Sequence, residues 1–160
     1  MVMKERSEPR ETFVLLRGEY DKSDKERQVF PATPAFLPRP DEGWPSNRLG
    51  LARWIVSPDN PLTARVAVNR LWLQVFGRGL VDSTENFGVQ CLPPQQAELL
   101  DWLAVEFVES GWDMKGMLRL IVNSSTYQQS SDYSPQSLAM DPENQFLGRG
   151  PRYRLTSEAI

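Results

Sequence analysis

Residues 60–81 have the sequence NPLTARVAVNRLWLQVFGRGLV, and this stretch decides the fold. Asn60 can accept hydrogen bonds from the first free N–H groups of a helix, and Pro61 suits the first helical position because it lacks an N–H. Gly77 favours the left-handed backbone that ends many helices. We therefore predict a helix over residues 61–76.

This predicted helix is apolar on two sides. At about 100° per residue, its apolar side chains fall on two faces that are separated by two polar strips. The first face holds Ala64, Val68, Leu71, Trp72 and Val75, and the second holds Leu62, Val66 and Leu73. A helix with two apolar faces is expected to pack on both sides, so we predict that it is central to the domain.

The polar strips hold Arg65 and Asn69 on one side and Arg70 on the other. We predict that all three side chains are largely buried and hydrogen-bonded, because arginine is rarely buried without a partner. Asp82 and Glu85 are candidate partners, since the chain turns back just after the helix. These five residues form a candidate polar cluster. The alternative is that Arg65 or Arg70 faces a cleft and binds an anion.

Asp82 and Glu85 also stand three residues apart within DSTENFG, residues 82–88. This spacing is typical of a capping box, in which the first side chain accepts a backbone N–H and the glutamate reaches back. Two carboxylates could instead act as an acid–base pair. The capping box is the commoner structure, and we favour it.

Three further helices follow from capping signals and apolar spacing. Ser46 or Asn47 can cap the first, a double proline precedes the strongest, and Asp113 can cap the last. Together with the helix above, they predict a mainly α-helical domain. The four main helices are expected near 47–56, 61–76, 95–110 and 114–123.

The N-terminal third has a different composition. TFVLLRG, residues 12–18, predicts a short strand. Residues 19–45 are charged and then proline-rich, so we predict an extended segment without regular structure over a helical core of residues 46–160. Residues 1–11 are expected to form a flexible tail. The extended segment has four candidate anchors: Phe30, Phe36, Leu37 and Trp44.

The C-terminal part is polar. SSTYQQSSDYSPQS, residues 124–137, predicts a loop. Arg149, Arg152 and Arg154 surround Tyr153 as in a small nucleic-acid patch, although salt links to an acidic helix face explain them equally well. Thr156 or Ser157 could cap a further helix, so we expect one domain, residues 1–160, of a longer protein.

Composition excludes several kinds of chemistry. The chain has no histidine and a single cysteine, Cys91, which excludes an internal disulfide, a Cys–His nucleophile and a Cys/His zinc site. We predict no cofactor and no haem or transition metal. Eighteen basic against 21 acidic residues give a net charge of −3, which argues against a nucleic-acid partner. No stretch resembles a membrane span or a signal peptide.

The ordered series of motifs resembles a known family. The motifs are NRLGLARWIVSPDNPLTARVAVNRLWLQVFGRGLV, ENFGVQ, QAELLDWLAVEFVESGWDMKGMLRLIVNSSTYQQSS and DPENQFLGRGPRYRLTSEAI. They resemble planctomycete domain of unknown function 1553, a C-terminal domain of exported proteins that often carry a cytochrome c domain. The resemblance implies a periplasmic or cell-envelope location. It also implies that the partners are other domains of the same polypeptide, with a cytochrome c domain as one candidate.

The sequence departs from this family at four positions. Histidines are frequent in the family where this chain has Gln74, Gln96 and Leu118, and arginine is common at Gln128. We interpret the family histidines as structural, because glutamine keeps hydrogen-bonding capacity and Leu118 lies on an apolar helix face.

The favoured function is a non-catalytic accessory or scaffold domain. Two alternatives remain open. A polysaccharide hydrolase would need two carboxylates across a cleft, and a carbohydrate- or anion-binding module would use tryptophans and arginines. The candidate carboxylates are Asp82, Glu85, Asp101 and Asp113; the candidate tryptophans are Trp44, Trp72 and Trp112.

Overall fold

The structure, a computed structural model, describes residues 6, 8, 10–88 and 90–153. The chain divides into two compact units, residues 1–54 and 55–160. Most of the tail expected at residues 1–11 falls outside the described residues, as do Arg154 and the helix expected after Thr156.

The first unit contains a β-hairpin. Strand β1 (Thr12–Leu15) pairs antiparallel with β2 (Ser23–Val29), with an irregularity between Phe13 and Val14. A short 3₁₀ turn (Leu16–Gly18) lies between them, so the strand expected over residues 12–18 is shorter than predicted. The absence of regular structure expected across 19–45 is wrong at β2. The polar sequence of β2 lacks the alternating apolar residues that predict a strand. The strand forms through backbone pairing with β1.

Residues 30–47 contain no helix or strand, as the prolines led us to expect. Phe30 and Phe36, two of the expected anchors, are exposed. The anchor of this segment is Trp54 of α1 (Arg48–Ile55), whose indole Nε1 donates a 2.7 Å hydrogen bond to the carbonyl of Pro38. An indole N–H that is largely buried needs such a partner.

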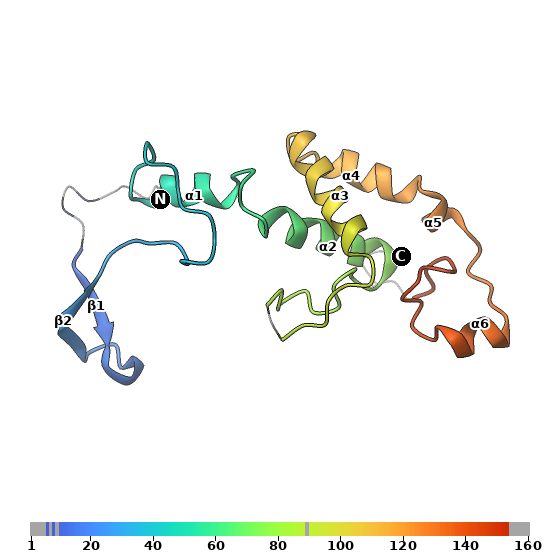
Figure 1. Ribbon diagram of the computed structural model, residues 1–160, viewed down its shortest axis with the longest axis horizontal. Helices are drawn as coiled ribbons and strands as arrows, with labels where there is room; N and C mark the ends of the chain where they lie inside the picture. The colour runs from blue at the N-terminus through green and yellow to red at the C-terminus, as the bar shows by residue number, and fades with distance from the viewer. Residues whose placement is uncertain (1–5, 7, 9, 89, 154–160) are drawn as a thin grey trace. The chain divides into compact units, whose positions relative to one another are not determined.

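The second unit is helical, and Figure 1 shows its main helices gathered together. The four main helices predicted from the sequence, α1 among them, are confirmed within the described residues, with ends displaced by no more than two residues.

The polar loop expected over 124–137 is wrong in part, because two short helices form there. Ser124 and Ser134 each accept a backbone N–H at the start of these helices, which local capping explains. The helices of this unit are α2 (Thr63–Phe76), α3 (Ala97–Glu109), α4 (Met114–Val122), α5 (Ser125–Gln128) and α6 (Pro135–Met140).

The helix ends follow the capping chemistry. The side-chain oxygen of Asn60 accepts hydrogen bonds from the N–H groups of Leu62 and Thr63, so it caps α2 although regular helix begins at Thr63. Asp113 caps α4 through the N–H of Gly116. Gly77 ends α2 with a φ of 76°, a backbone conformation that glycine adopts without strain.

One apolar core holds α2, α3 and α4 together. The rings of Trp72 and Phe76 on α2 are stacked, with centroids 4.1 Å apart, and Phe107 of α3 meets Trp112 edge to face at 5.2 Å. α2 packs against both α3 and α4, which makes it the central helix of this unit. The buried core comprises Val68, Leu71, Trp72, Phe76, Leu80, Val81, Leu100, Leu103, Phe107, Met117 and Ile121.

Candidate functional site

Arg65 projects from α2 towards α3. Its Nε lies 2.6 Å from the Asp101 carboxylate, and its Nη1 donates to the carbonyl of Pro61. The expectation that Asp82 or Glu85 would be the partner is wrong for this arginine. The reason is that α3 packs along α2 and places the Asp101 carboxylate next to Arg65.

Arg70 lies on the opposite strip of α2 and is exposed. Its Nη2 is 3.8 Å from Glu85 Oε1, and 57% of the arginine side chain and 85% of the glutamate side chain are accessible to solvent. The prediction that Arg70 is largely buried is therefore wrong. The second apolar face of α2, with Leu62 and Leu73, is only partly covered, so the strip beside it stays open to water.

Asn69 is the polar residue that the core encloses. Its side chain is fully buried, its Nδ2 donates to the carbonyl of Val81 at 2.9 Å, and its Oδ1 accepts the N–H of Val81 at 2.9 Å. The side-chain amide thus replaces a backbone partner for a loop residue that is itself buried. A Cβ at Gly79 would lie 2.5 Å from the Val81 carbonyl oxygen and 2.8 Å from Asn69 Nδ2, so this close approach requires glycine.

Asp82 follows this turn and pairs with Arg78. Both carboxylate oxygens accept from the guanidinium, with Nη2–Oδ2 at 2.6 Å, and Arg78 Nη1 lies 2.9 Å from Glu143 Oε2. The hydrogen bonds from Arg78 lower the pKa of Asp82, and those same bonds raise the pKa of Arg78. No helix begins within the described part of residues 82–88, so the capping box favoured by the sequence is wrong.

The Arg78 pairs form one side of a cleft of about 320 Å³. The end of α2 and the turn after it supply one wall, and residues 92–96 before α3 supply another. Residues 142–153 supply the third. Among the cluster predicted from the sequence, Asp82 alone lines this cleft.

Polar side chains fasten the 141–153 loop, which carries the third wall. Gln96 Nε2 donates to the carbonyl of Gln145 at 2.6 Å, and the Tyr153 hydroxyl donates to the carbonyl of Gln74 at 2.5 Å. Burial raises the pKa of Tyr153, which keeps the phenol in its donating form. Both side chains therefore hold the loop that borders the cleft.

Arg149 forms hydrogen bonds within the same loop. Its guanidinium donates to the carbonyls of Asp141 and Pro142 at 2.9 and 2.7 Å, and the Asn144 side chain exchanges hydrogen bonds with the Arg149 backbone. The structure thus gives this arginine of the suspected nucleic-acid patch partners within the chain. Sequence reasoning missed these loop contacts, because a backbone carbonyl acceptor leaves no mark in the sequence.

The positions where the chain departs from the family have structural contacts. Gln96 holds the 141–153 loop as just described, and a histidine N–H could donate to the same kind of carbonyl. Leu118 packs against the core, whereas Gln74 is exposed and contributes its backbone carbonyl to Tyr153. The Nε2 of Gln128 reaches the carbonyl of Val122 at 3.4 Å.

The tryptophans divide into packed and open ones. Trp72 is buried and Trp112 is partly buried against the core, as expected of structural tryptophans. Trp102 on α3 was not singled out by the sequence, yet 52% of it is exposed. Because most of its neighbours in the sequence are apolar, nothing in the sequence indicated that Trp102 is exposed.

In the described part of the chain, no three His, Cys, Asp or Glu side chains gather as ligands for a metal ion. Within the same residues, no helix has the length and apolar character required to cross a membrane.

A family model described as PSD1, protein of unknown function (DUF1553), matches residues 47–160. No curated protein and no solved structure shows significant similarity to the chain. The matched region begins at the residue that caps α1, since the Asn47 side chain accepts the N–H groups of Leu49 and Gly50.

Proposed function

The chain belongs to the PSD1 family of proteins of unknown function (DUF1553), and on that premise we propose that it is a non-catalytic accessory or scaffold domain of a larger exported protein. Its partners are other domains of the same polypeptide, with a cytochrome c domain as one candidate. Its location is the periplasm or cell envelope. The resemblance noted in the sequence supports these last two parts of the proposal.

One observation carries the non-catalytic part. Every carboxylate that the sequence nominated for catalysis has a structural partner in the same unit. The partners are Arg78 for Asp82, Arg65 for Asp101, Arg70 at 3.8 Å for Glu85, and the N–H of Gly116 for Asp113. Contacts of this kind give these carboxylates a structural role in ion pairs and helix capping.

The direction of the pKa shifts supports the same conclusion. A glycosidase acid is a carboxyl group whose pKa is raised, so that it still holds a proton near neutral pH. Hydrogen bonds from Arg78 and Arg65 instead lower the pKa values of Asp82 and Asp101. Both groups are therefore ionised near pH 7 and suit ion pairing better than general acid catalysis.

The experiment compares the full polypeptide with two altered forms. In the first, Asp82→Asn and Asp101→Asn are combined; in the second, residues 47–160 are deleted. We expect the double variant to retain at least half of any activity of the full protein, while the deletion lowers its assembly or yield. A loss of activity greater than about 100-fold in a double variant that folds normally would contradict the proposal, because it is the size expected for removing acid–base groups.

A further inference from the structure

A second hollow lies between α3 and α4. It is an open groove of about 560 Å³ whose lining includes Leu99, Trp102 and Leu120. Trp102 is 52% exposed and Leu120 is 39% exposed, so two large apolar side chains border the groove in contact with water.

An exposed tryptophan beside an open apolar groove is typical of an interface anchor. Removing so large an apolar side chain from water stabilises an association. Tryptophan is also enriched among the few residues that carry most of the binding energy at interfaces. Trp102 therefore has the features of an anchor without a partner inside its own unit.

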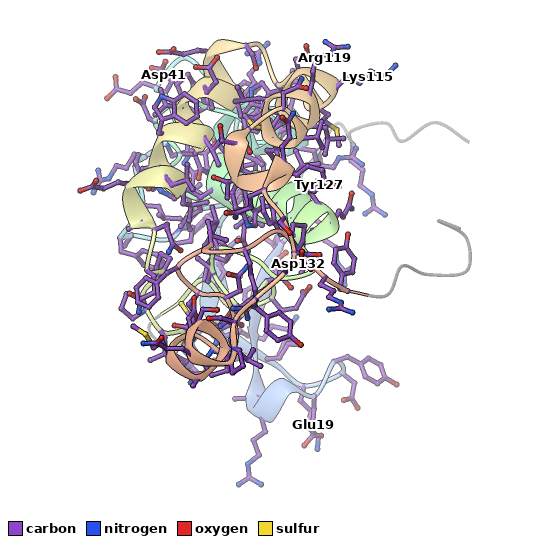
Figure 2. The ribbon with its side chains drawn as sticks, turned by 90° about the vertical axis from the view of Figure 1, so that its right-hand side faces the viewer. Glu19, Asp41, Lys115, Arg119, Tyr127 and Asp132 are labelled. Carbon is purple, nitrogen blue, oxygen red and sulfur yellow. The ribbon has the colours of Figure 1, made fainter. Side chains whose placement is uncertain are left out.

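The charges on the two walls are opposite in sign. The exposed carboxylates of Glu106 and Glu109 follow Trp102 by four and seven residues on α3, so they share its side of the helix. On the other side, α4 carries Lys115 and Arg119, four residues apart, and Arg119 itself lines the groove. Figure 2 shows Lys115 and Arg119 close to each other in this view.

This arrangement is complementary to itself. When a face is rotated by a two-fold axis that lies in the interface and runs parallel to the groove, its left side meets the right side of its partner. An acidic wall on α3 would then oppose the basic wall of a second α4, and the apolar middle would meet itself. A binding partner of one charge sign would fit only one of the two walls.

We propose that a second copy of this chain occupies the α3–α4 groove in a two-fold dimer, with each Trp102 seated against the groove of its partner. This inference goes beyond the accessory function and does not depend on it. The two helices form a face on the order of 20 Å by 20 Å, or about 800 Å² over both partners, which is the size of a weak or transient interface, so we expect a dimer of no more than micromolar affinity.

The test measures the mass of the full 160-residue chain by sedimentation equilibrium, over about 1 to 500 µM to bracket a micromolar affinity. We expect the wild type to pass from monomer to dimer. Trp102→Ala should weaken the dimer at least 10-fold. So should each of two charge reversals, Glu106→Lys with Glu109→Lys, and Lys115→Glu with Arg119→Glu.

Mixing the two charge-reversed chains distinguishes a dimer through this face from dimers through other surfaces. One chain then has two basic walls and the other has two acidic walls, so an equimolar mixture should restore a 1:1 dimer that neither chain forms alone. Asp132→Lys, an exposed position that Figure 2 places away from Lys115 and Arg119, is the control and should leave dimerisation unchanged.

Three results would overturn the proposal. The first is a wild-type chain that remains monomeric at the highest concentration, even if the groove then binds another protein. The second is a dimer that survives Trp102→Ala. The third is a mixture of the two reversed chains, each folded by circular dichroism, that stays monomeric.

Discussion

The α2–α4 core and the 141–153 loop of the second unit are held by different interactions. Apolar side chains on three helices make the core, with Phe107 and Ile121 almost completely buried. The loop is held by polar side chains that donate to backbone carbonyls, such as Gln96 to Gln145. Burial of apolar surface is the larger stabilising term, whereas one neutral hydrogen bond adds only about 0.5–1.5 kcal/mol. We therefore expect the core to determine global stability and the loop to respond locally.

The sharpest test of the core is Phe107→Ala. This change removes a ring that is 3% exposed and that meets Trp112 edge to face, so it should lower the free energy of unfolding by about 3–5 kcal/mol. Chemical denaturation followed by circular dichroism measures the change. Val105→Ala on the exposed side of the same helix is the control and should cost less than about 1 kcal/mol. Equal losses at the two positions would mean that the core is placed incorrectly.

Asn69→Ala tests whether a buried polar group can matter as much as apolar packing. The substitution leaves the buried N–H and C=O of Val81 without their partner, which should cost roughly 2–4 kcal/mol. Arg70→Ala, the next residue along α2, removes only an exposed contact at 3.8 Å and should cost less than about 0.5 kcal/mol. Denaturation midpoints of the two variants give the comparison directly. If the two variants lost the same stability, the buried Asn69 would contribute no more to the fold than the exposed Arg70.

A change at Gln96 should loosen the loop while leaving the core intact. In Gln96→Ala the carbonyl of Gln145 loses its donor, at a cost of about 1 kcal/mol or less. Because loops open locally without global unfolding, hydrogen exchange at the amides of residues 145–150 should accelerate while those of α2 stay protected. Gln95→Ala is the matched control, since that exposed glutamine lines the cleft without a hydrogen bond in the described part of the chain. Faster exchange throughout α2 would show that the loop supports the core more than we infer.

The same difference explains what the sequence could predict. The pattern of Val68, Leu71 and Trp72 predicts a central helix because burial requires particular residue types at a regular spacing. A side-chain donor needs only a carbonyl, which every residue supplies, so Gln96 and Tyr153 carry no signal. The predicted partner of Arg65 was wrong for a related reason. Asp101 reaches Arg65 through the packing of α3 on α2, which nearness in sequence does not reveal.

The smallest expected effect concerns Asp82. Its partner Arg78 lies in the turn after α2 and also pairs with Glu143 of the 141–153 loop. The pKa of Asp82 is lowered in the folded chain, so its ion pair stabilises the fold above the unfolded pKa near 3.8 and this contribution is lost as pH falls through the folded pKa. With 59% of the aspartate side chain exposed, solvent screens the pair and limits it to about 0.2–1 kcal/mol. Asp82→Asn should therefore lower the urea midpoint slightly at pH 7 and make its fall below pH 4 less steep. Asp132→Asn, also exposed, should leave both features unchanged. If the wild type and Asp82→Asn lost stability with the same steepness below pH 4, the Arg78–Asp82 pair would contribute nothing to the fold, and Arg78 would act on the 141–153 loop through Glu143 alone.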